Sequence, residues 1–276
     1  MVIEKDVMNF TSMFKSYTGL INRTDSQRII VLGMGGSGIS GDIASALCDM
    51  TSSTQVTSWK DYGLPKWATK KDSVICISYS GNTEETLSGA QKAIELGCKV
   101  SAITTGGKLE KIVANYGGEI TKIEAGHQPR AALPLLITPI LEKIGIDNLD
   151  KQIYEIRSME IEVEKAKKIA QQINGKLPCI YSSGIIGCIA YRWRCQIEEN
   201  AKQMAFHHLL PEMNHNEIVG WTIPHDELAV IVLRDNKETK EMQKRFETTI
   251  NLAWKEKKVD IIEITASGKY PLTRMM

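Results

Sequence analysis

Short apolar runs alternate with amphipathic segments along the first half of the chain. Val7, Phe10 and Phe14 recur at helical spacing, which predicts a helix over about residues 1–25. The expected strands are 28–32, 54–59, 73–78 and 99–104, and the expected helices follow the glycine cluster at 33–38 and span 84–96. Strands that alternate with helices at this spacing predict a parallel, doubly wound sheet.

The second half of the chain repeats this alternation. A charged stretch over about 148–175 is expected to be helical and to mark the boundary between two lobes, 1–148 and 149–276. Further strands are expected at 177–181, 228–233 and 259–264, and further helices at 185–204 and 238–255. The pattern therefore predicts the α/β class, with two tandem lobes that each hold a parallel sheet flanked by helices in three layers (αβα).

Composition agrees with a two-lobed globular protein. The chain has 276 residues, of which 42% are hydrophobic, and this is enough for two modest lobes or one large one. Its 34 basic and 33 acidic residues nearly balance, so charge gives no reason to expect nucleic acid or a membrane surface as a partner. No apolar run approaches the ~20 residues needed to cross a bilayer, and the first residues lack the pattern of a secretory signal.

The cysteines favour a cytoplasmic location. All six are scattered through apolar segments, and none forms a C-x-x-C pair. Buried, reduced thiols explain this distribution better than disulfides or a zinc site would.

A glycine-rich loop separates the first strand from the helix that follows it. Glycines let a backbone approach an anion closely, and the N–H groups at a helix start favour negative charge. Gly33, Gly35 and Gly38 also match the G-x-G-x-x-G dinucleotide fingerprint, but the acidic residue that should follow the second strand has only a poor candidate in Asp61. A turn that serves close packing alone is the third interpretation.

A hydroxyl-rich turn follows the third strand. Ser78, Ser80 and Thr83 lie in the segment SYSGNTEET, next to a helix N-terminus. Hydroxyl and backbone N–H groups suit a phosphate monoester, which needs many donors. Capping of the helix by Thr83, with Glu85 or Thr86 in the first turn, is also expected, but it does not explain Ser78 and Ser80.

The two loops together carry a specific resemblance. GMGGSGISGD and SYSGNTEET, each between a strand and a helix, resemble the sugar isomerase (SIS) domain, and within it the archaeal-type bifunctional phosphoglucose/phosphomannose isomerases, over about residues 28–268. The resemblance implies two tandem SIS-type lobes and a bound sugar phosphate. The implied substrate-binding residues are Gly35, Gly36, Ser37, Ser78, Ser80 and Thr83.

The same resemblance implies three catalytic residues. Arg130, in the segment PRAA, would stabilise a negative enediolate intermediate, for which an always-charged planar donor is suited. Glu199, in ENAK, would transfer the proton between C1 and C2, and His215, in NHNE, would assist ring opening. From the residues alone, Arg130 could equally be a surface or capping arginine, and Glu199 could lie on a solvated helix face.

Neighbouring residues compete for two of these roles. Glu198 is the alternative to Glu199, and three other histidines compete with His215 without its polar flanks; they are His207, His208 and His225. The His207–His208 pair hints weakly at a metal, but no second ligand set stands at zinc spacing.

The resemblance implies an isomerase that interconverts glucose 6-phosphate, and mannose 6-phosphate too, with fructose 6-phosphate through a cis-enediolate. Proton transfer of this kind needs no metal and no redox cofactor. The partners expected are the hexose 6-phosphate and a second copy of the chain, with His215 supplied across the dimer interface. A sugar-phosphate-binding sensor without catalysis is the alternative, and an NAD-dependent oxidoreductase is a third reading.

The chain stops at Met276, before the family's C-terminal helical segment. The lysine and threonine of that segment have no match here, and Lys269 and Thr273 are not assigned their roles. Met275 and Met276 are expected to be disordered or to pack loosely.

Overall fold

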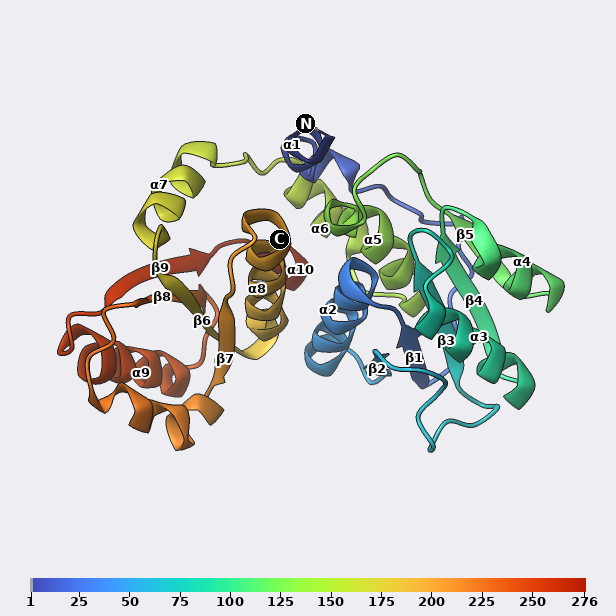
Figure 1. The fold of residues 1–276 in the computed structure, drawn as a ribbon. Coiled ribbons are helices and arrows are strands. Elements are labelled where there is room, and N and C mark those ends of the chain that lie inside the picture. Colours follow the sequence, from blue (N-terminus) through green and yellow to red (C-terminus); the bar gives the residue numbers. More distant parts are fainter. Residues whose placement is uncertain (1) are drawn as a thin grey trace. The chain divides into compact units, whose positions relative to one another are not determined.

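A computed structural model describes residues 2–276 and divides them into two compact units (Figure 1). The first unit runs to Met159 and the second spans Glu160–Met276. The sequence placed the boundary at 148/149, inside the stretch expected to be one helix. The structure instead has two helices there, α6 (Leu149–Arg157) and α7 (Val163–Ile173), and α6 falls in the first unit.

The first unit is built on a five-stranded parallel sheet with strand order β2-β1-β3-β4-β5. Its strands are β1 (Arg28–Leu32), β2 (Gln55–Trp59), β3 (Ser73–Ser78), β4 (Lys99–Thr104) and β5 (Glu119–Lys122). The first four confirm the expected strands, and β5 was not expected. Strands β1 and β3 are neighbours, with Leu32 opposite Cys76. The loops that follow these two strands therefore begin side by side.

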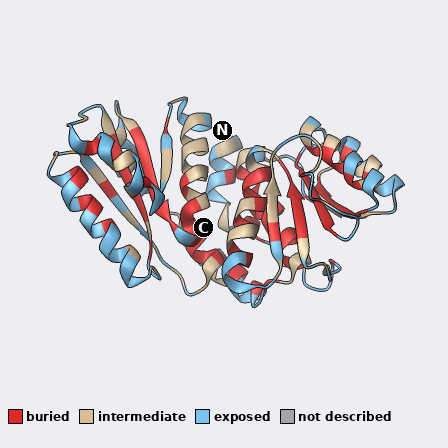
Figure 2. Ribbon diagram, turned by 90° about the horizontal axis from the view of Figure 1, so that it is seen from below, coloured by how far each residue is buried: buried red, intermediate tan, exposed pale blue. Residues whose placement is uncertain are grey.

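Helices cover both faces of this sheet, as the three-layer prediction requires. Helices α2 (Gly35–Thr51) and α5 (Leu133–Ile144) pack together, and so do α3 (Glu84–Leu96) and α4 (Gly107–Asn115). Successive strand residues point to opposite faces, so Ile30 and Val74 pack in the cluster that includes Leu109 and Val113 of α4. Figure 2 shows that burial is concentrated in the strands and in the helix faces turned toward them.

The helix expected over 1–25 is wrong beyond its first two turns. The chain forms α1 (Val2–Met8) and a single 3-10 turn, η1 (Thr11–Met13), and then leaves helical structure. Short polar side chains compete with the helix here, since the Ser12 hydroxyl donates to the Asn9 carbonyl at 2.7 Å. Phe14 is nonetheless fully buried, with its ring edge-on to that of Phe10.

The second unit has a four-stranded parallel sheet with order β7-β6-β8-β9. Its strands are β6 (Leu177–Ser183), β7 (Phe206–Leu210), β8 (Leu228–Asp235) and β9 (Asp260–Ala266). Three were expected. Edge strand β7 was not, because its sequence FHHLL lacks the β-branched residues and the alternation that mark a strand.

The helices of the second unit differ from expectation at their ends. One face of the sheet carries α8 (Gly187–Ala201), which follows a 3-10 turn, η3 (Gly184–Ile186). The other face carries α9 (Lys240–Thr249) and a π-helical turn, η6 (Ile250–Lys255), where one continuous helix over 238–255 was expected. There Tyr181 packs in one cluster with Phe246 and Trp254.

The last segment packs more tightly than the sequence suggested. Helix α10 (Pro271–Met275) was not expected, and Met275 is only 3% exposed instead of loosely packed. The Arg274 guanidinium bonds the Asp235 carboxylate at 2.7 Å, and both side chains are buried.

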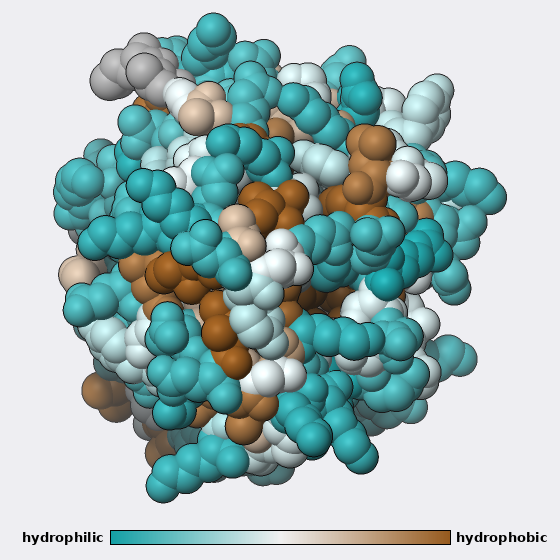
Figure 3. Space-filling model, turned by 90° about the vertical axis from the view of Figure 1, so that its right-hand side faces the viewer, coloured by the Kyte–Doolittle hydropathy of each residue, from teal (hydrophilic) through white to brown (hydrophobic). Residues whose placement is uncertain are grey.

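The surface and the cysteines agree with a folded globular chain. The face in Figure 3 is mostly hydrophilic, with hydrophobic side chains gathered near its middle. In residues 2–276 no helix is both long and apolar enough to cross a membrane. All six cysteines are free thiols; four are buried, and Cys188 and Cys195 are half-buried.

Candidate active site

Strand order places the two candidate loops of the first unit at a topological switch point. The helices after β1 and β3 lie on opposite faces of the sheet, so the carboxyl ends of these neighbouring strands form the point at which the strand order reverses. In open α/β sheets, ligands bind outside the carboxyl ends of the strands at such a switch point. The glycine loop at Gly33–Gly38 and the Ser78–Thr83 turn both begin there.

Close packing of backbone on backbone shapes the glycine loop. Gly35 has a φ of +52° and opens α2, whereas Gly36 faces the loop that carries Arg130. A Cβ atom on Gly36 would lie 2.8 Å from the Pro129 carbonyl oxygen and 3.4 Å from the Arg130 Cα atom. Ser37, 7% exposed, places its hydroxyl in the first turn of α2. Glycine therefore serves packing here, and that packing brings the Arg130 loop onto the start of α2.

Two hydroxyls of the Ser78–Thr83 turn bond each other. Ser78 is fully buried, and its Oγ atom lies 2.8 Å from Thr83 Oγ1. Thr83 occupies the N-cap position of α3, but its side chain makes no capping hydrogen bond among the described residues. The expected capping by Thr83 is thus wrong, because Ser78 engages the hydroxyl. The first N–H groups of α3 are left for a ligand or water.

Ser80 differs from the other two hydroxyl residues of the turn. Its side chain is exposed, and its Oγ atom accepts a hydrogen bond from the Asn82 N–H at 3.2 Å. An exposed hydroxyl beside a helix N-terminus can reach an anion without any change in the fold.

Glycines brace this turn against the loop after β4. Gly81 has a φ of +68°, and a Cβ there would lie 1.7 Å from the Gly106 carbonyl oxygen. The Asn82 Oδ1 atom accepts from the Lys108 N–H at 3.2 Å, and the Gly81 carbonyl accepts from the Leu109 N–H at 2.9 Å. The turn is therefore fixed by backbone contacts on the side away from β1.

Arg130 lies in a 3-10 turn, η2 (Pro129–Ala131), beside the glycine loop. Its side chain is half-buried, and its Nη1 atom donates to Gln128 Oε1 at 3.3 Å. The structure therefore brings the seven candidate residues of the first unit to the carboxyl ends of β1 and β3. They are Gly35, Gly36, Ser37, Ser78, Ser80, Thr83 and Arg130.

Glu199 lies near the end of α8, in the second unit. Its side chain is exposed, and its backbone carbonyl accepts from Lys202 Nζ at 2.6 Å. The competing carboxylate, Glu198, forms an ion pair with Arg194 at 3.0 Å one turn away. Glu198 is thus paired within its own helix, whereas the Glu199 side chain is exposed.

His215 ends a 3-10 turn, η4 (Glu212–His215), and its ring is exposed. The residues on both sides are anchored: Asn214 donates to Thr249 Oγ1 at 2.8 Å, and Asn216 donates to Glu212 Oε1 at 2.7 Å. The segment is thus held while its imidazole faces outward. In the described chain, no hydrogen bond or ion pair joins His215 to Glu199.

Glu217, which the sequence did not single out, is the main anchor of this segment. Its carboxylate accepts hydrogen bonds from the Tyr181 hydroxyl, from His208 Nδ1 at 2.7 Å and from Trp221 Nε1 at 3.5 Å. Burial, reinforced by the neighbouring Cys179 and Glu217, raises the pKa of Tyr181 far above its usual value, so the phenol stays a donor. The signal was present in NHNE, whose glutamate follows the histidine by two residues.

The other histidines have structural partners. His208 bonds Glu217, and His225 bonds the Gly220 carbonyl at 3.0 Å. The His207 ring packs on that of Tyr191, 5.3 Å between centroids, and burial lowers the pKa of His207. His207 and His208 are successive strand residues and point to opposite faces, so they cannot share a metal. Among residues 2–276, no three His, Cys, Asp or Glu side chains are placed to hold a metal ion.

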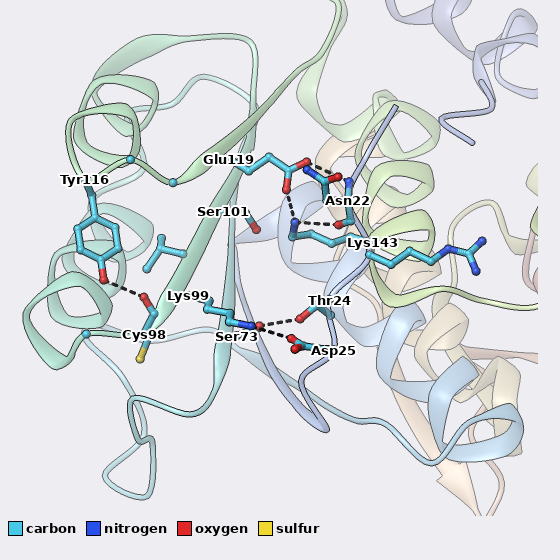
Figure 4. Close-up of a pocket in the computed structure, with 15 residues that line it drawn as sticks. Asn22, Thr24, Asp25, Ser73, Cys98, Lys99, Ser101, Tyr116, Glu119 and Lys143 are labelled. Carbon is cyan, nitrogen blue, oxygen red and sulfur yellow. Dashed lines mark hydrogen bonds and ion pairs between the residues drawn. The ribbon is translucent and has the colours of Figure 1, made fainter. Parts of the chain in front are cut away.

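A cavity of about 580 Å³ lies at the amino ends of strands in the first sheet, opposite to the carboxyl ends where the candidate residues lie (Figure 4). Its lining includes Ser73 and Lys99 at the amino ends of β3 and β4. Both lysines of the lining pair with acidic groups of the lining, Lys99 with Asp25 at 2.7 Å and Lys143 with Glu119 at 2.6 Å. It lies away from the candidate residues and is not the site they form.

Each of the two units matches a known domain family. The SIS domain family matches residues 24–120, and the bacterial phospho-glucose isomerase C-terminal SIS domain matches residues 162–276. Among solved structures, the C-terminal domain of glucosamine-fructose-6-phosphate aminotransferase from Francisella tularensis superposes with a TM-score of 0.72 at 15% identity, over 99% of this chain and 92% of that one. At this identity the likeness supports the fold alone.

Two curated relatives are much closer in sequence. The bifunctional phosphoglucose/phosphomannose isomerase of Aquifex aeolicus is 36% identical over 253 residues, which are 90% of this chain and 79% of that protein. The D-glucosamine-6-phosphate 4-epimerase of Sulfolobus acidocaldarius is 35% identical over 202 residues, which are 70% of this chain and 63% of that protein. With two SIS units, the motifs of both loops and this extent of identity, the chain belongs to the family of bifunctional phosphoglucose/phosphomannose isomerases.

Proposed function

We propose that this chain interconverts glucose 6-phosphate, and mannose 6-phosphate, with fructose 6-phosphate in the cytoplasm. The single observation that carries the proposal is the membership of an isomerase family in a chain that keeps the hydroxyl turn at the β1/β3 switch point. The reaction moves one proton between two adjacent carbons of the open-chain sugar and leaves the oxidation state of the molecule unchanged. It therefore needs no redox cofactor, and we propose that it needs no metal.

The phosphate is held at the N-terminus of α3 in this proposal. The exposed Ser80 hydroxyl and the first N–H groups of α3 donate to the phosphate oxygens, while the Ser78–Thr83 pair fixes the shape of the turn. Gly35, Gly36 and Ser37 contact the sugar from the facing loop. Anchoring the phosphate orients the reactive carbons, which is a large part of the catalytic task.

Three side chains carry the chemistry in this proposal. His215 assists ring opening by moving a proton to the ring oxygen. Glu199 then takes the proton from C2 of the aldose, which gives a cis-enediolate, and returns it to C1; the proton on O2 passes to O1, which gives the ketose. Arg130 stabilises the negative oxygen of the intermediate.

We also propose that the working form is a homodimer in which His215 acts on the partner's substrate. The observations in favour are the exposure of the His215 ring and the anchoring of its flanks, which suit a side chain presented to another surface.

A second candidate is epimerisation at C4 of an amino-sugar phosphate, because a relative with that name is as similar in identity as the isomerases are. A sensor that binds without turnover is the third. Purified protein incubated with fructose 6-phosphate, mannose 6-phosphate and glucosamine 6-phosphate separates the three, with product sugars resolved by chromatography. We expect aldose formation from fructose 6-phosphate, unchanged by EDTA and without NAD; binding without product, or an epimer only, refutes the proposal.

Two variants test the assigned residues. Glu199→Gln should lower kcat at least about 100-fold, as loss of a general base does, and Glu198→Gln is its matched control.

Ser80→Ala should raise KM about 10-fold through loss of one charge-assisted hydrogen bond, whereas Ser53→Ala, on an exposed loop, should not. Full activity in Glu199→Gln, or unchanged affinity in Ser80→Ala, refutes these roles.

A further inference from the structure

A buried carboxylate in the N-terminal helix touches the loop that carries Arg130. Asp6 is 4% exposed, and it contacts residues 121 and 122 positions further along the chain. One oxygen lies 2.8 Å from His127 Nδ1, and the other accepts the Gln128 N–H at 2.8 Å. None of the assigned roles uses this cluster.

Asp6 is ionised in the folded protein, which strengthens its hydrogen bonds to His127 and Gln128. Burial alone would raise its pKa, but the hydrogen bonds from Gln128 and His127 hold the pKa below the usual value of 3.8. Asp6 is therefore a carboxylate at neutral pH. A buried carboxylate with two donors makes strong, directional bonds, because it has no water to exchange them for.

These hydrogen bonds hold the backbone that starts the Arg130 turn. Gln128 is the N-cap residue of η2, and its carbonyl accepts from the Ala131 N–H at 2.8 Å and the Ala132 N–H at 3.1 Å. Its side-chain oxygen accepts from Arg130 Nη1 at 3.3 Å. Asp6 thus fixes the residue that both begins the turn and holds the guanidinium.

The same loop is tied to the Ser78–Thr83 turn. The His127 N–H donates to the Tyr79 hydroxyl at 2.9 Å, and that hydroxyl donates to the Glu124 carbonyl at 3.2 Å. Tyr79 directly follows Ser78. Through Asp6 and Tyr79 the Arg130 loop is held from two sides, and its distance to the Ser78–Thr83 turn is set by hydrogen bonds.

We propose that Asp6, acting through His127 and Gln128, is a positioning residue for Arg130. The inference rests on the proposed function, in which Arg130 meets negative charge that develops during the reaction. A guanidinium displaced by about 1 Å loses much of that stabilisation, whereas phosphate binding at α3 is left intact.

The test compares two ligands with each variant. A five-carbon aldonic acid phosphate carries a carboxylate where the enediolate forms, and the matching alditol phosphate carries a neutral hydroxyl there. Asp6→Ala and the near-isosteric Asp6→Asn should bind the acid about 10-fold more weakly and the alditol unchanged. Their kcat should fall about 10- to 100-fold with little change in KM. Glu4→Gln, which removes an exposed charge from the same helix, should match the wild type.

A double-variant cycle with Arg130→Ala completes the test. If Asp6 acts on Arg130, Asp6→Ala should cost nothing further once the guanidinium is gone. The inference is overturned if the fold losses in kcat of the two single variants multiply in the double variant. It is also overturned if Asp6→Ala weakens both ligands equally, or if a folded Asp6→Ala protein keeps the wild-type kcat. A wild-type protein that turns over no hexose phosphate refutes the proposed function instead, and the ligand pair still shows whether Asp6 acts on Arg130.

Discussion

Single glycines decide how closely the loops around the candidate site approach one another. Gly36 lets the Arg130 loop lie on the start of α2, and Gly81 lets the Ser78–Thr83 turn lie on the loop after β4. Both contacts join backbone to backbone, so a side chain at either position cannot be absorbed by a change of rotamer. Their role is therefore geometric, and it follows from the coordinates of their neighbours.

Gly81→Ala should lower the free energy of unfolding by roughly 2–5 kcal/mol, because it adds overpacking to an unfavourable positive φ. Gly63→Ala is the matched control: Gly63 has a φ of +64°, and an added Cβ there meets nothing within 4 Å. It should cost only about 1–2 kcal/mol. Urea unfolding of both variants measures the difference, and equal losses would contradict the backbone contact at Gly81.

At the residue scale, the two candidate loops could be predicted from the sequence, but the residues that hold them in place could not. The hydroxyl turn and the glycine loop are each recognisable from consecutive residues, and the structure places them together at the carboxyl ends of β1 and β3. Asp6 and Tyr79 have none, because their partners stand more than 40 positions away along the chain. The mistaken capping by Thr83 has the same origin, since a local rule cannot anticipate competition from Ser78.

At the scale of elements, the buried strands of the first unit and helix α3 were the most predictable, whereas β5 and most of the helix over 1–25 were not predicted correctly. Strands β3 and β4 and helix α3 match their expected bounds, because buried parallel strands read as continuous apolar runs. Strand β7 and helix α10 were missed, since one carries two histidines on a sheet edge and the other is only five residues long. The long helix expected over 148–175 is broken near 158–162, where charged composition gave no stop signal.

Ion pairs also join elements at the amino ends of the strands. Arg28 opens β1, and its guanidinium bonds both oxygens of Asp72, which directly precedes β3. The Asp72 side chain is 2% exposed. Burial alone would raise its pKa, but Arg28 and the Thr69 N–H hold the pKa below its usual value of 3.8.

This pair should make unfolding depend on pH in the acid range. Because the folded pKa of Asp72 is depressed, its stabilisation is fully present above its unfolded pKa of 3.8 and is lost as the pH falls through the lower folded pKa. Asp72→Asn should lower the free energy of unfolding at pH 7 and flatten its decline below about pH 5. Urea titrations from pH 7 to pH 3 measure both effects, and wild-type pH dependence in the variant would refute the argument.

At the scale of the whole molecule, the proposed catalytic residues are divided between the two units. Arg130 and the Ser78–Thr83 turn belong to the first, whereas Glu199 and His215 belong to the second. The tandem arrangement was predictable because the strand–turn–helix pattern recurs. The boundary was not predictable, since no change in composition separates α6, in the first unit, from α7, in the second. Neither unit holds the full set of proposed residues, so activity should require both.

The proposed exchange of His215 between subunits predicts complementation. A His215→Ala protein and a Glu199→Gln protein should each be nearly inactive, yet a dimer of one with the other contains one intact site. After unfolding and refolding of an equal mixture, half of the dimers are mixed, so about a quarter of the wild-type activity should return. Co-refolding of either variant with itself is the control. No recovery in proven mixed dimers would place His215 and Glu199 of one site on the same subunit.

The Ser78–Thr83 hydroxyl pair has a consequence for how the affinity of the proposed phosphate site should respond to salt and pH. With these two oxygens bonded to each other, the proposed phosphate site would present the neutral Ser80 hydroxyl and amide dipoles in place of mobile cationic side chains. Fixed dipoles at short range are screened by salt much less than exposed charges are. Affinity should thus change little between dilute and concentrated buffer, but it should fall as acid adds a proton to the phosphate near its second ionisation, at about pH 6.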